Sequence, residues 1–255
     1  MPILIKYKNS NKTKIYGLIG FPLSHTFSPV YFKNKFLKEG ILNTRYQAFE
    51  IENVSAFLAL LEQGVLGLNV TIPFKEKVIQ YLDEIEESAQ IIGAVNTIKN
   101  VEGRLIGYNT DVYGFEESLK PLLNKKMKRQ AIIFGSGGAS KAVQFVLKKL
   151  DFKYRVVSRS RGDLMYDELT EIVFNNTSIL INTTPLGTFP KVDQCPDIPY
   201  EFLNASHLVY DLIYNPKKTL FLSNAEAQGA TIKNGYQMLE LQAEKSWHIW
   251  NTNYE

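Results

Sequence analysis

The sequence predicts an α/β protein of two domains, and three observations lead to this fold class. Short apolar strands and amphipathic helices alternate over the first 111 residues, as they do in α/β sheets. A second alternation carries a strand, a glycine-rich turn and a helix in that order, and the chain ends in a long amphipathic helix. We expect an α/β substrate-binding domain at residues 1–111 and 236–255, and a Rossmann-like domain at 112–235. The C-terminal helix should return to the first domain.

The elements of the first domain follow from its apolar runs and helix signals. Ser28 is the expected N-cap of a helix that runs to about Glu39, because Pro29 suits the first helical position. Pro73 should open another helix for the same reason. A turn at residues 101–104 should join two strands. We expect strands at 14–20, 44–50, 66–71, 94–97 and 105–108, and helices at 54–63 and 73–82.

Polar side chains gather where several of these strands end. Asn69 and Thr71 close one apolar strand, and Lys75 follows four residues later. Asn96 and Asp111 close two further apolar segments. One Asn-Thr pair alone is ordinary turn chemistry. Three such ends, one of them with a lysine, instead indicate a binding site for a small polyhydroxylated molecule, because open α/β sheets bind ligands at strand ends.

Composition narrows the classes of function. The net charge of +3 over 255 residues gives no reason to expect nucleic-acid partners, and the basic run at 125–129 is expected to be a solvated loop. With Cys195 as the single cysteine, no intrachain disulfide can form. The three histidines show no metal-ligand spacing. No apolar run reaches the ~20 residues of a membrane span. We therefore expect a cytoplasmic protein without a metal.

The second domain begins with a dinucleotide-binding pattern. A buried strand at 130–134 runs into Gly135-Ser136-Gly137-Gly138-Ala139-Ser140, and a helix is expected at 141–150. Gly135 would allow the tight turn, and Gly137 would let the backbone approach a pyrophosphate at the helix N-terminus. A bare glycine pattern is a weak signal, but the strand before it and the helix after it supply the required context.

The residues after the next strand indicate which dinucleotide binds. NAD-binding folds place a carboxylate about 20 residues beyond the glycines. This chain has Ser158, Arg159 and Ser160 there. Because arginine suits a 2′-phosphate, the sequence predicts NADP. The remaining elements are expected strands at 154–157, 178–182, 208–214 and 230–232, and helices at 112–123, 219–228 and 237–250.

Taken together, the motifs resemble the shikimate dehydrogenase family, over nearly the whole chain. They are Pro22 to Pro29, Asn69 to Lys75, Gly93 to Thr97, Asn109 to Asp111, Gly135 to Ser140, Ser158 to Ser160, Asn182 to Gly187, Tyr210-Asp211, Tyr214 to Pro216, Gly235, Met238-Leu239 and Gln242-Ala243. The resemblance implies reversible reduction of 3-dehydroshikimate to shikimate with NADPH, in the aromatic amino-acid and chorismate pathway. The expected partners are this small-molecule substrate and the cofactor, and the expected state is a monomer or homodimer, with no membrane partner.

The resemblance also implies the residue roles. Lys75 and Asp111 match the catalytic pair. The matching substrate contacts are Thr26, Ser28, Asn69, Thr71, Asn96, Tyr214 and Gln242, and the matching cofactor contacts are Gly135, Ser136, Gly137, Gly138, Ala139, Ser158, Arg159, Ser160, Thr183 and Gly235. Thr26 stands where the family has a serine, so the carboxylate pocket should be slightly smaller. The segment after Arg159 is shorter than in typical members, which leaves the strength of the NADP preference open.

Three alternatives remain open at this stage. A quinate/shikimate dehydrogenase of the same fold could use a broader range of substrates or cofactors, including NAD. A catalytically silent NADP-binding regulator would share the cofactor motifs, although the intact Lys75 and Asp111 argue against it. A folate-linked dehydrogenase or tRNA-dependent reductase would carry different residues in the first half of the chain.

Overall fold

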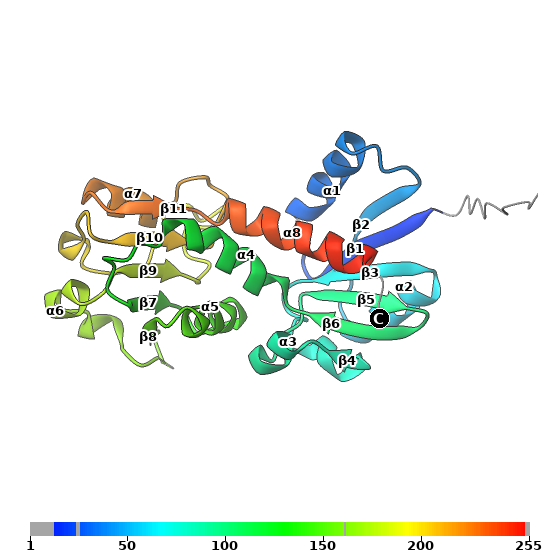
Figure 1. The fold of residues 1–255 in the computed structure, drawn as a ribbon, viewed down its shortest axis with the longest axis horizontal. Helices are drawn as coiled ribbons and strands as arrows, with labels where there is room; N and C mark the ends of the chain where they lie inside the picture. Colours follow the sequence, from blue (N-terminus) through cyan, green and yellow to red (C-terminus); the bar gives the residue numbers. More distant parts are fainter. Residues whose placement is uncertain (1–12, 24–25, 161, 253–255) are drawn as a thin grey trace, which may run out of the picture. The chain divides into compact units, whose positions relative to one another are not determined.

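The computed structural model describes residues 13–23, 26–160 and 162–252. Its contacts divide the chain into two compact units. The first unit holds residues 1–89, 95–108 and 249–255, and the second holds 90–94 and 109–248. This division differs from the expected one at 90–94, 109–111 and 236–248, and the assignment of a function to each part stays a prediction. The α/β fold class with two sheets is confirmed (Figure 1).

The first unit is built on a mixed sheet with strand order β2-β1-β3-β5-β6-β4. β1 is parallel to β2 and β3, whereas β5 runs antiparallel to β3 and β6. The strands are β1 Lys14–Gly20, β2 Thr44–Glu50, β3 Val65–Val70, β4 Glu84–Ile85, β5 Thr97–Val101 and β6 Arg104–Tyr108. The α-helices placed in the chain between them are α1 Phe27–Lys38, α2 Phe57–Glu62 and α3 Glu87–Ile92.

Two expected features of this unit are wrong in detail. The helix predicted to start at Pro73 is a turn followed by the 3₁₀ helix Lys77–Tyr81. The carbonyl of Lys75 accepts a hydrogen bond from Val95 N–H at 2.8 Å, so it is already engaged outside any helix. Helix α1 begins at Phe27 with Thr26 as its N-cap. Ser28 is the second residue of the helix and therefore cannot be its N-cap, and its hydroxyl is bonded to Tyr46.

Trp250 anchors the end of the C-terminal helix, α8 Tyr236–Asn251, within the first unit. Its indole N–H donates to the Ile98 carbonyl at 2.9 Å, and its ring stacks on Tyr16 at 4.9 Å between centroids. The ring occupies space that exists because residue 67 is glycine. A Cβ there would lie 2.4 Å from the indole. Trp250, almost two hundred positions from Gly67 in the sequence, therefore packs against one face of the sheet at this glycine.

Gly67→Ala should destabilise the protein by about 1–3 kcal/mol, because the added methyl overpacks a site whose indole is held by a hydrogen bond. Urea denaturation of the variant and the wild type measures this difference. Leu66→Ala is the control, since Leu66 is exposed on the same strand. Equal stability of Gly67→Ala and the wild type would contradict the close packing of Trp250 against residue 67.

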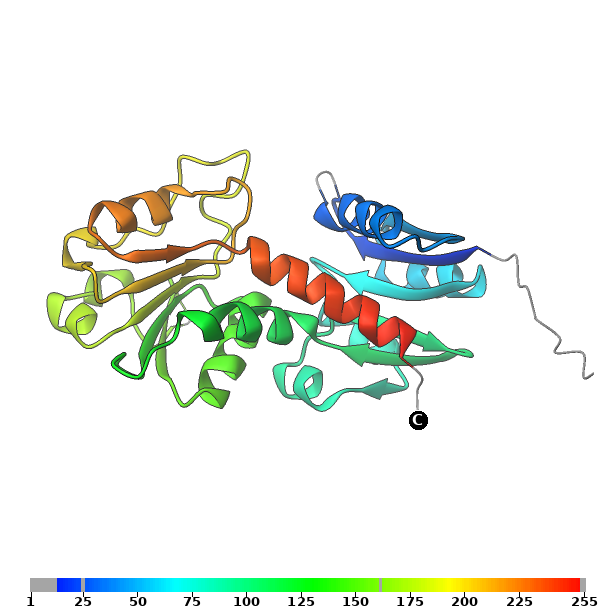
Figure 2. The same cartoon turned by 45° about the horizontal axis from the view of Figure 1, so that its top comes forward.

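The second unit is a parallel sheet with strand order β11-β10-β9-β7-β8. Its strands are β7 Gln130–Phe134, β8 Lys153–Val157, β9 Ile179–Asn182, β10 Leu208–Asp211 and β11 Thr231–Lys233. Its α-helices are α4 Thr110–Leu119, α5 Gly138–Lys149, α6 Glu171–Asn175 and α7 Leu220–Ala227, with most of α8 (Figure 2). β10 is shorter than predicted, because the Asp211 carboxylate accepts the Ile213 N–H and turns the chain.

Alternation along the strands places helices on both faces of this sheet. Ala131 and Ile133 of β7 pack in one cluster with α4 and α5, whereas Ile132 and Phe134 pack in another with α6 and α7. The period of two residues in a buried strand requires this arrangement. Across the described part of the chain, no helix combines the length and apolarity needed to cross a membrane.

Candidate active site

The first group of predicted site residues lies at one edge of the first unit's sheet. Thr97 is paired with Asn69 of β3 and with Tyr108 of β6. The expected strand ending at Thr97 is wrong, because β5 begins there instead. Since β5 is antiparallel to its neighbours, its start meets the ends of β3 and β6. The Asn69 side chain and the Asn96 backbone therefore lie close together, and Asn69 Nδ2 donates a hydrogen bond to the Asn96 carbonyl at 3.2 Å.

A hydrogen-bonded network joins three of these predicted residues. Asn69 Nδ2 donates to Thr97 Oγ1 at 3.0 Å, and Thr97 Oγ1 donates to Asn96 Oδ1 at 3.2 Å. Tyr46 donates its hydroxyl to Asn69 Oδ1 at 2.8 Å and is also hydrogen-bonded to Ser28. Burial raises the pKa of Tyr46, so its phenol stays protonated. The network holds hydroxyl and amide groups in fixed orientations, as recognition of a polyhydroxylated ligand requires.

Two members of this network were not predicted from the sequence. Thr97 belongs to the Asn96-Thr97 pair of the sequence, but a single pair of this kind is common in turns and does not indicate a binding site. Tyr46 lies within β2 and carries no sequence signal, since a tyrosine in a strand ordinarily packs. Its role depends on the parallel pairing of β1 with β2, which sets Tyr46 opposite Tyr16.

Thr71 and Lys75 follow β3 on a backbone that is well held. Thr71 N–H donates to the Ile19 carbonyl at 2.9 Å, and Phe74 N–H donates to the Thr71 carbonyl at 3.0 Å. The Lys75 carbonyl accepts from Val95, one residue before Asn96. Both side chains are partly buried. Thr26 is described and partly buried, whereas Ser24 and His25 of the same loop lie outside the described residues.

Asp111 and Gln242 belong to a pair of packed helices in the second unit. Asn109 caps α4 by accepting the Asp111 N–H at 3.1 Å, so Asp111 lies in the first helical turn, where a carboxylate is favoured. One turn later, a Cβ on Gly114 would lie 3.2 Å from Gln242 Cβ. Asp111 is buried, with 6% exposure. Tyr214 is half-buried in the loop after β10, and burial raises the pKa of its phenol.

A pocket of about 570 Å³ lies at the carboxyl edge of the second unit's parallel sheet. β7 lies between β8 and β9, so the chain reverses direction across the sheet there, and such switch points bind ligands in open α/β sheets. Seven predicted cofactor residues line it: Gly135, Ser136, Gly137, Ser158, Arg159, Ser160 and Thr183. The other lining residues are Tyr166, Thr184, Pro185, Leu186, Cys195 and Asp197.

The glycine turn has the form that a dinucleotide needs. Gly135 has φ of +101°, and a Cβ on it would lie 2.8 Å from Thr183 Oγ1. Gly137 has an ordinary φ of −81°, and a Cβ on it would meet no atom within 4 Å. Packing therefore explains glycine at 135 but not at 137. The space above Gly137 fits a pyrophosphate at the α5 N-terminus, where no side chain caps the helix.

The charged groups around the pocket fit a 2′-phosphate better than a bare ribose. Arg159 is exposed on the lining, directly after β8. Asp163, the nearest following carboxylate in the sequence, accepts the Val156 N–H at 2.8 Å and so points back to the strand. Asp197 reaches the lining from a separate loop. Arg161 lies outside the described residues.

Three predicted cofactor residues do not line this pocket. Gly138 and Ala139 are the first residues of α5, which begins three residues earlier than predicted. Gly235 is required by packing, because a Cβ there would lie 1.9 Å from the Leu212 carbonyl oxygen. A cofactor contact at these three positions stays a prediction.

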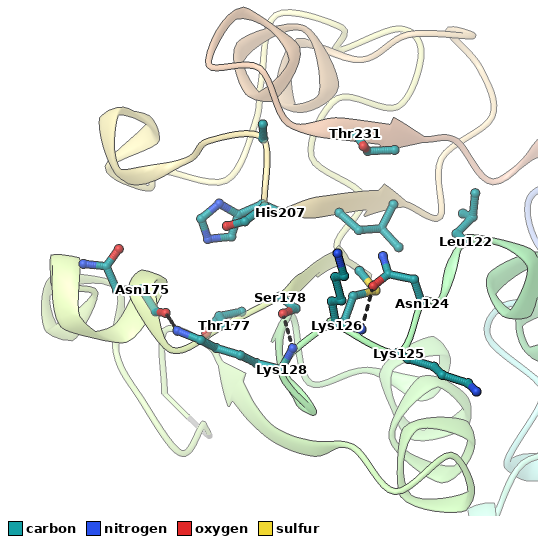
Figure 3. A pocket seen from close by; sticks show the side chains of 14 residues that line it. Leu122, Asn124, Lys125, Lys126, Lys128, Asn175, Thr177, Ser178, His207 and Thr231 are labelled. Carbon is teal, nitrogen blue, oxygen red and sulfur yellow. Dashed lines mark hydrogen bonds between the residues drawn. The ribbon is translucent and has the colours of Figure 1, made fainter.

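A second pocket, of about 560 Å³, lies at the opposite, amino edge of this sheet (Figure 3). Lys125, Lys126 and Lys128 line it, but Lys128 Nζ donates to the Asn175 carbonyl and Lys125 points away. Both ring nitrogens of His207 are engaged, by Asn204 N–H and by the Phe174 carbonyl. None of the predicted site residues lies here. Among the described residues, no cluster of three His, Cys, Asp or Glu could hold a metal.

The pH dependence of stability should carry a signature of Asp211, at the end of β10. Burial raises the pKa of this carboxyl from 3.8 to about 6. Between these values Asp211 binds more protons in the folded protein than in the unfolded chain, so its contribution to stability falls as pH rises from about 4 to 6. Above pH 6 the ionised group costs on the order of 3 kcal/mol. Thermal melts should show Asp211→Asn gaining stability over the wild type between pH 4.5 and 7.5. A constant difference would contradict the raised pKa.

Comparison with known proteins identifies proteins that are similar to this chain. The profile described as "Shikimate dehydrogenase substrate binding domain" matches residues 18–98. A protein from Caldanaerobacter subterraneus subsp. tengcongensis, named shikimate dehydrogenase (NADP(+)), is 38% identical over 97% of this chain and 95% of its own.

Two solved structures extend the comparison. The Thermus thermophilus shikimate 5-dehydrogenase in complex with NADP(H) and shikimate has a TM-score of 0.82 and 30% identity, covering 93% of each chain. The ligand-free 5-ketofructose reductase of a Gluconobacter species has a TM-score of 0.80 and 28% identity, covering 94% of this chain and 93% of its own.

Proposed function

We propose that the chain catalyses the reversible, NADPH-dependent reduction of 3-dehydroshikimate to shikimate. The chain belongs to the shikimate dehydrogenase family. The observation that carries this proposal is the network of Ser28, Asn69 and Asn96 at one sheet edge, next to the segment that holds Lys75. Amide and hydroxyl groups at fixed positions suit the ring hydroxyls of such a substrate. The family relationship identifies which polyhydroxylated molecule it is.

The cofactor pocket is proposed to hold NADP(H), which supplies the hydride when bound. The backbone at Ser136 and Gly137 would receive the pyrophosphate, and Arg159 with Ser158 and Ser160 would receive the 2′-phosphate. Thr183 would contribute to the lining on the other side of the glycine turn. The fit rests on the open space at Gly137 and on the position of Arg159.

Lys75 is proposed to act on the substrate carbonyl. During reduction, negative charge develops on the ring ketone oxygen, and a cationic donor at that oxygen stabilises the transition state and delivers the proton. Asp111 would orient Lys75 and share a substrate hydroxyl. The two residues belong to different units, so their pairing is part of the proposal. Thr26, Thr71, Tyr214 and Gln242 would complete the substrate contacts.

Loss of NADPH absorbance on addition of 3-dehydroshikimate tests the proposal, with NADH and quinate run beside it. We expect fast turnover with NADPH and slow turnover with NADH. Turnover of quinate with NAD would favour the broader quinate/shikimate activity. A folded protein that binds NADPH without turnover would favour the regulator. Because a 5-ketofructose reductase shares the fold, 5-ketofructose belongs in the substrate panel, and its preferential reduction would overturn the proposal. We propose a cytoplasmic monomer or homodimer.

A further inference from the structure

Asp211 is a buried carboxylate that the proposed reaction does not use. It is fully buried at the end of β10, and it forms no ion pair within the described part of the chain. It accepts three hydrogen bonds: from Thr219 Oγ1 at 2.6 Å, from Ile213 N–H at 3.0 Å and from Asn182 Nδ2 at 3.1 Å. A buried charge held only by neutral donors is costly to keep, so its presence calls for a function.

The bond to Asn182 fixes the orientation of that side-chain amide. An ionised carboxylate only accepts hydrogen bonds, so the Asn182 NH₂ group faces Asp211, and Asn182 Nδ2 also donates to the Leu186 carbonyl at 3.4 Å. Asn182 Oδ1 then faces Thr184 and accepts both its N–H, at 3.0 Å, and its hydroxyl, at 2.6 Å. The orientation of one amide thus couples the end of β10 to the loop after β9.

This loop is a wall of the cofactor pocket. Thr183, Thr184, Pro185 and Leu186 all line it. Thr184 also reaches the glycine turn, because a Cβ on Gly135 would lie 3.0 Å from Thr184 Cγ2. The Thr184 hydroxyl oxygen further accepts the Leu186 N–H at 3.3 Å. A change in the orientation of the Asn182 amide would therefore alter the position of the loop after β9 and of the glycine turn that Thr184 contacts.

We propose that Asp211 is a positioning residue for the cofactor: its ionised carboxylate orients the Asn182 amide, which holds Thr184 and the pocket wall in the binding geometry. The identity of the ligand as NADP(H) rests on the proposed function, but the relay itself rests on the contacts above. A protonated Asp211 carries a donor and loses its charge-assisted bonds, which are about twice as strong as neutral ones.

The relay should make cofactor binding sensitive to pH near 6, where burial sets the pKa of Asp211. The titratable group that faces Asp211 is Tyr200, which approaches from the 3₁₀ helix Tyr200–Phe202. Burial raises the pKa of Tyr200 far above this range, so it stays neutral. Cys195 hydrogen-bonds Tyr200 and is the next group outward. Asn182 and Thr219 do not titrate.

The test is the dissociation constant of NADPH, measured by its fluorescence from pH 5.5 to 7.5, for wild type, Asp211→Asn and the control Asp193→Asn. At pH 7.5 we expect Asp211→Asn to bind NADPH about three- to tenfold more weakly, the range of one lost hydrogen bond. The ratio of the two dissociation constants should fall towards one as pH is lowered to 5.5, below the pKa of Asp211. Titration of the cofactor's own phosphate, near pH 6, is common to all proteins and cancels in the ratio.

A purely structural role gives a different result. At pH 7.5 the Asp211→Asn variant should be more thermally stable than the wild type yet bind NADPH less tightly. If Asp211 had only a structural role, stability and NADPH affinity would change in the same direction. A constant ratio of dissociation constants across the pH range would overturn the proposal, as would wild-type affinity at pH 7.5. Because only NADPH binding is measured, failure to reduce 3-dehydroshikimate would count against the proposed function alone.

A double-mutant cycle with Thr184 tests the same relay without relying on one variant. Thr184→Val should weaken NADPH binding, and Thr184→Ser, which keeps the hydroxyl, should restore it. In the Thr184→Val background Asp211→Asn should have little further effect, because both act through Asn182. Additive losses would show that Thr184 and Asp211 act separately and would overturn the relay. If Asp211→Asn does not fold, Asn182→Ala takes its place in the cycle.

Discussion

Lys75→Ala should lower kcat for reduction of 3-dehydroshikimate by at least about 10²–10³-fold, the loss seen when one donor to a developing oxyanion is removed. The reason is that the ring oxygen gains negative charge in the transition state, and no neutral alanine can stabilise it. The KM for NADPH should change little, because Lys75 is not among the residues that line the cofactor pocket.

Lys77→Ala is the matched control for this experiment. Lys77 is an exposed lysine two residues further on, in the 3₁₀ helix. It should keep wild-type turnover. A Lys75→Ala enzyme with kcat within tenfold of the wild type would remove Lys75 from the proposed mechanism. Equal losses in both variants would indicate damage to the segment rather than loss of a catalytic group.

Arg159→Ala should weaken NADPH binding by about 10- to 100-fold and leave NADH binding nearly unchanged. The guanidinium is proposed to bind the 2′-phosphate, and hydrogen bonds between charged groups contribute about 1.5–3 kcal/mol. NADH lacks that phosphate, so it loses nothing. Because Arg159 is exposed, the substitution should not lower the melting temperature.

Steady-state KM values for both cofactors measure this change, and Lys153→Ala is its control. Lys153 is an exposed cation at the opposite, amino end of β8. Its removal tests whether general loss of positive charge weakens NADPH binding. If Arg159→Ala weakened the binding of NADH and NADPH equally, the arginine would not bind the 2′-phosphate, and another residue would have to make that contact.

Much of the cofactor site could be predicted because its determinants are local. A strand, a glycine turn and a helix follow one another directly in the sequence, and each step has a steric reason that is readable from residue type. Gly135, Ser136 and Gly137 line the pocket for that reason, whereas the other four predicted lining residues follow β8 and β9. Gly235 shows the limit of this reading. Its glycine is demanded by a carbonyl of Leu212, a contact between distant segments.

The substrate side was predicted less completely because it depends on strand direction. Alternation in a strand has the same period whether its neighbours are parallel or antiparallel, so nothing local revealed that β5 starts at Thr97. The predicted Pro73 helix failed similarly. The local signal was sound, but the Lys75 carbonyl bonds to Val95 on another segment. The hydroxyl of Tyr46 joined the network through pairing alone.

The sequence by itself determined the α/β class, most strands of the two sheets and the chemistry available near their ends, because period, breakers and residue type are properties of neighbouring residues. The tertiary structure decided which of those ends meet, why Gly67 must leave room for Trp250 and why Asp211 is buried among neutral donors. These outcomes are contacts between segments far apart in the chain, and their energies exist only once the sheets have formed.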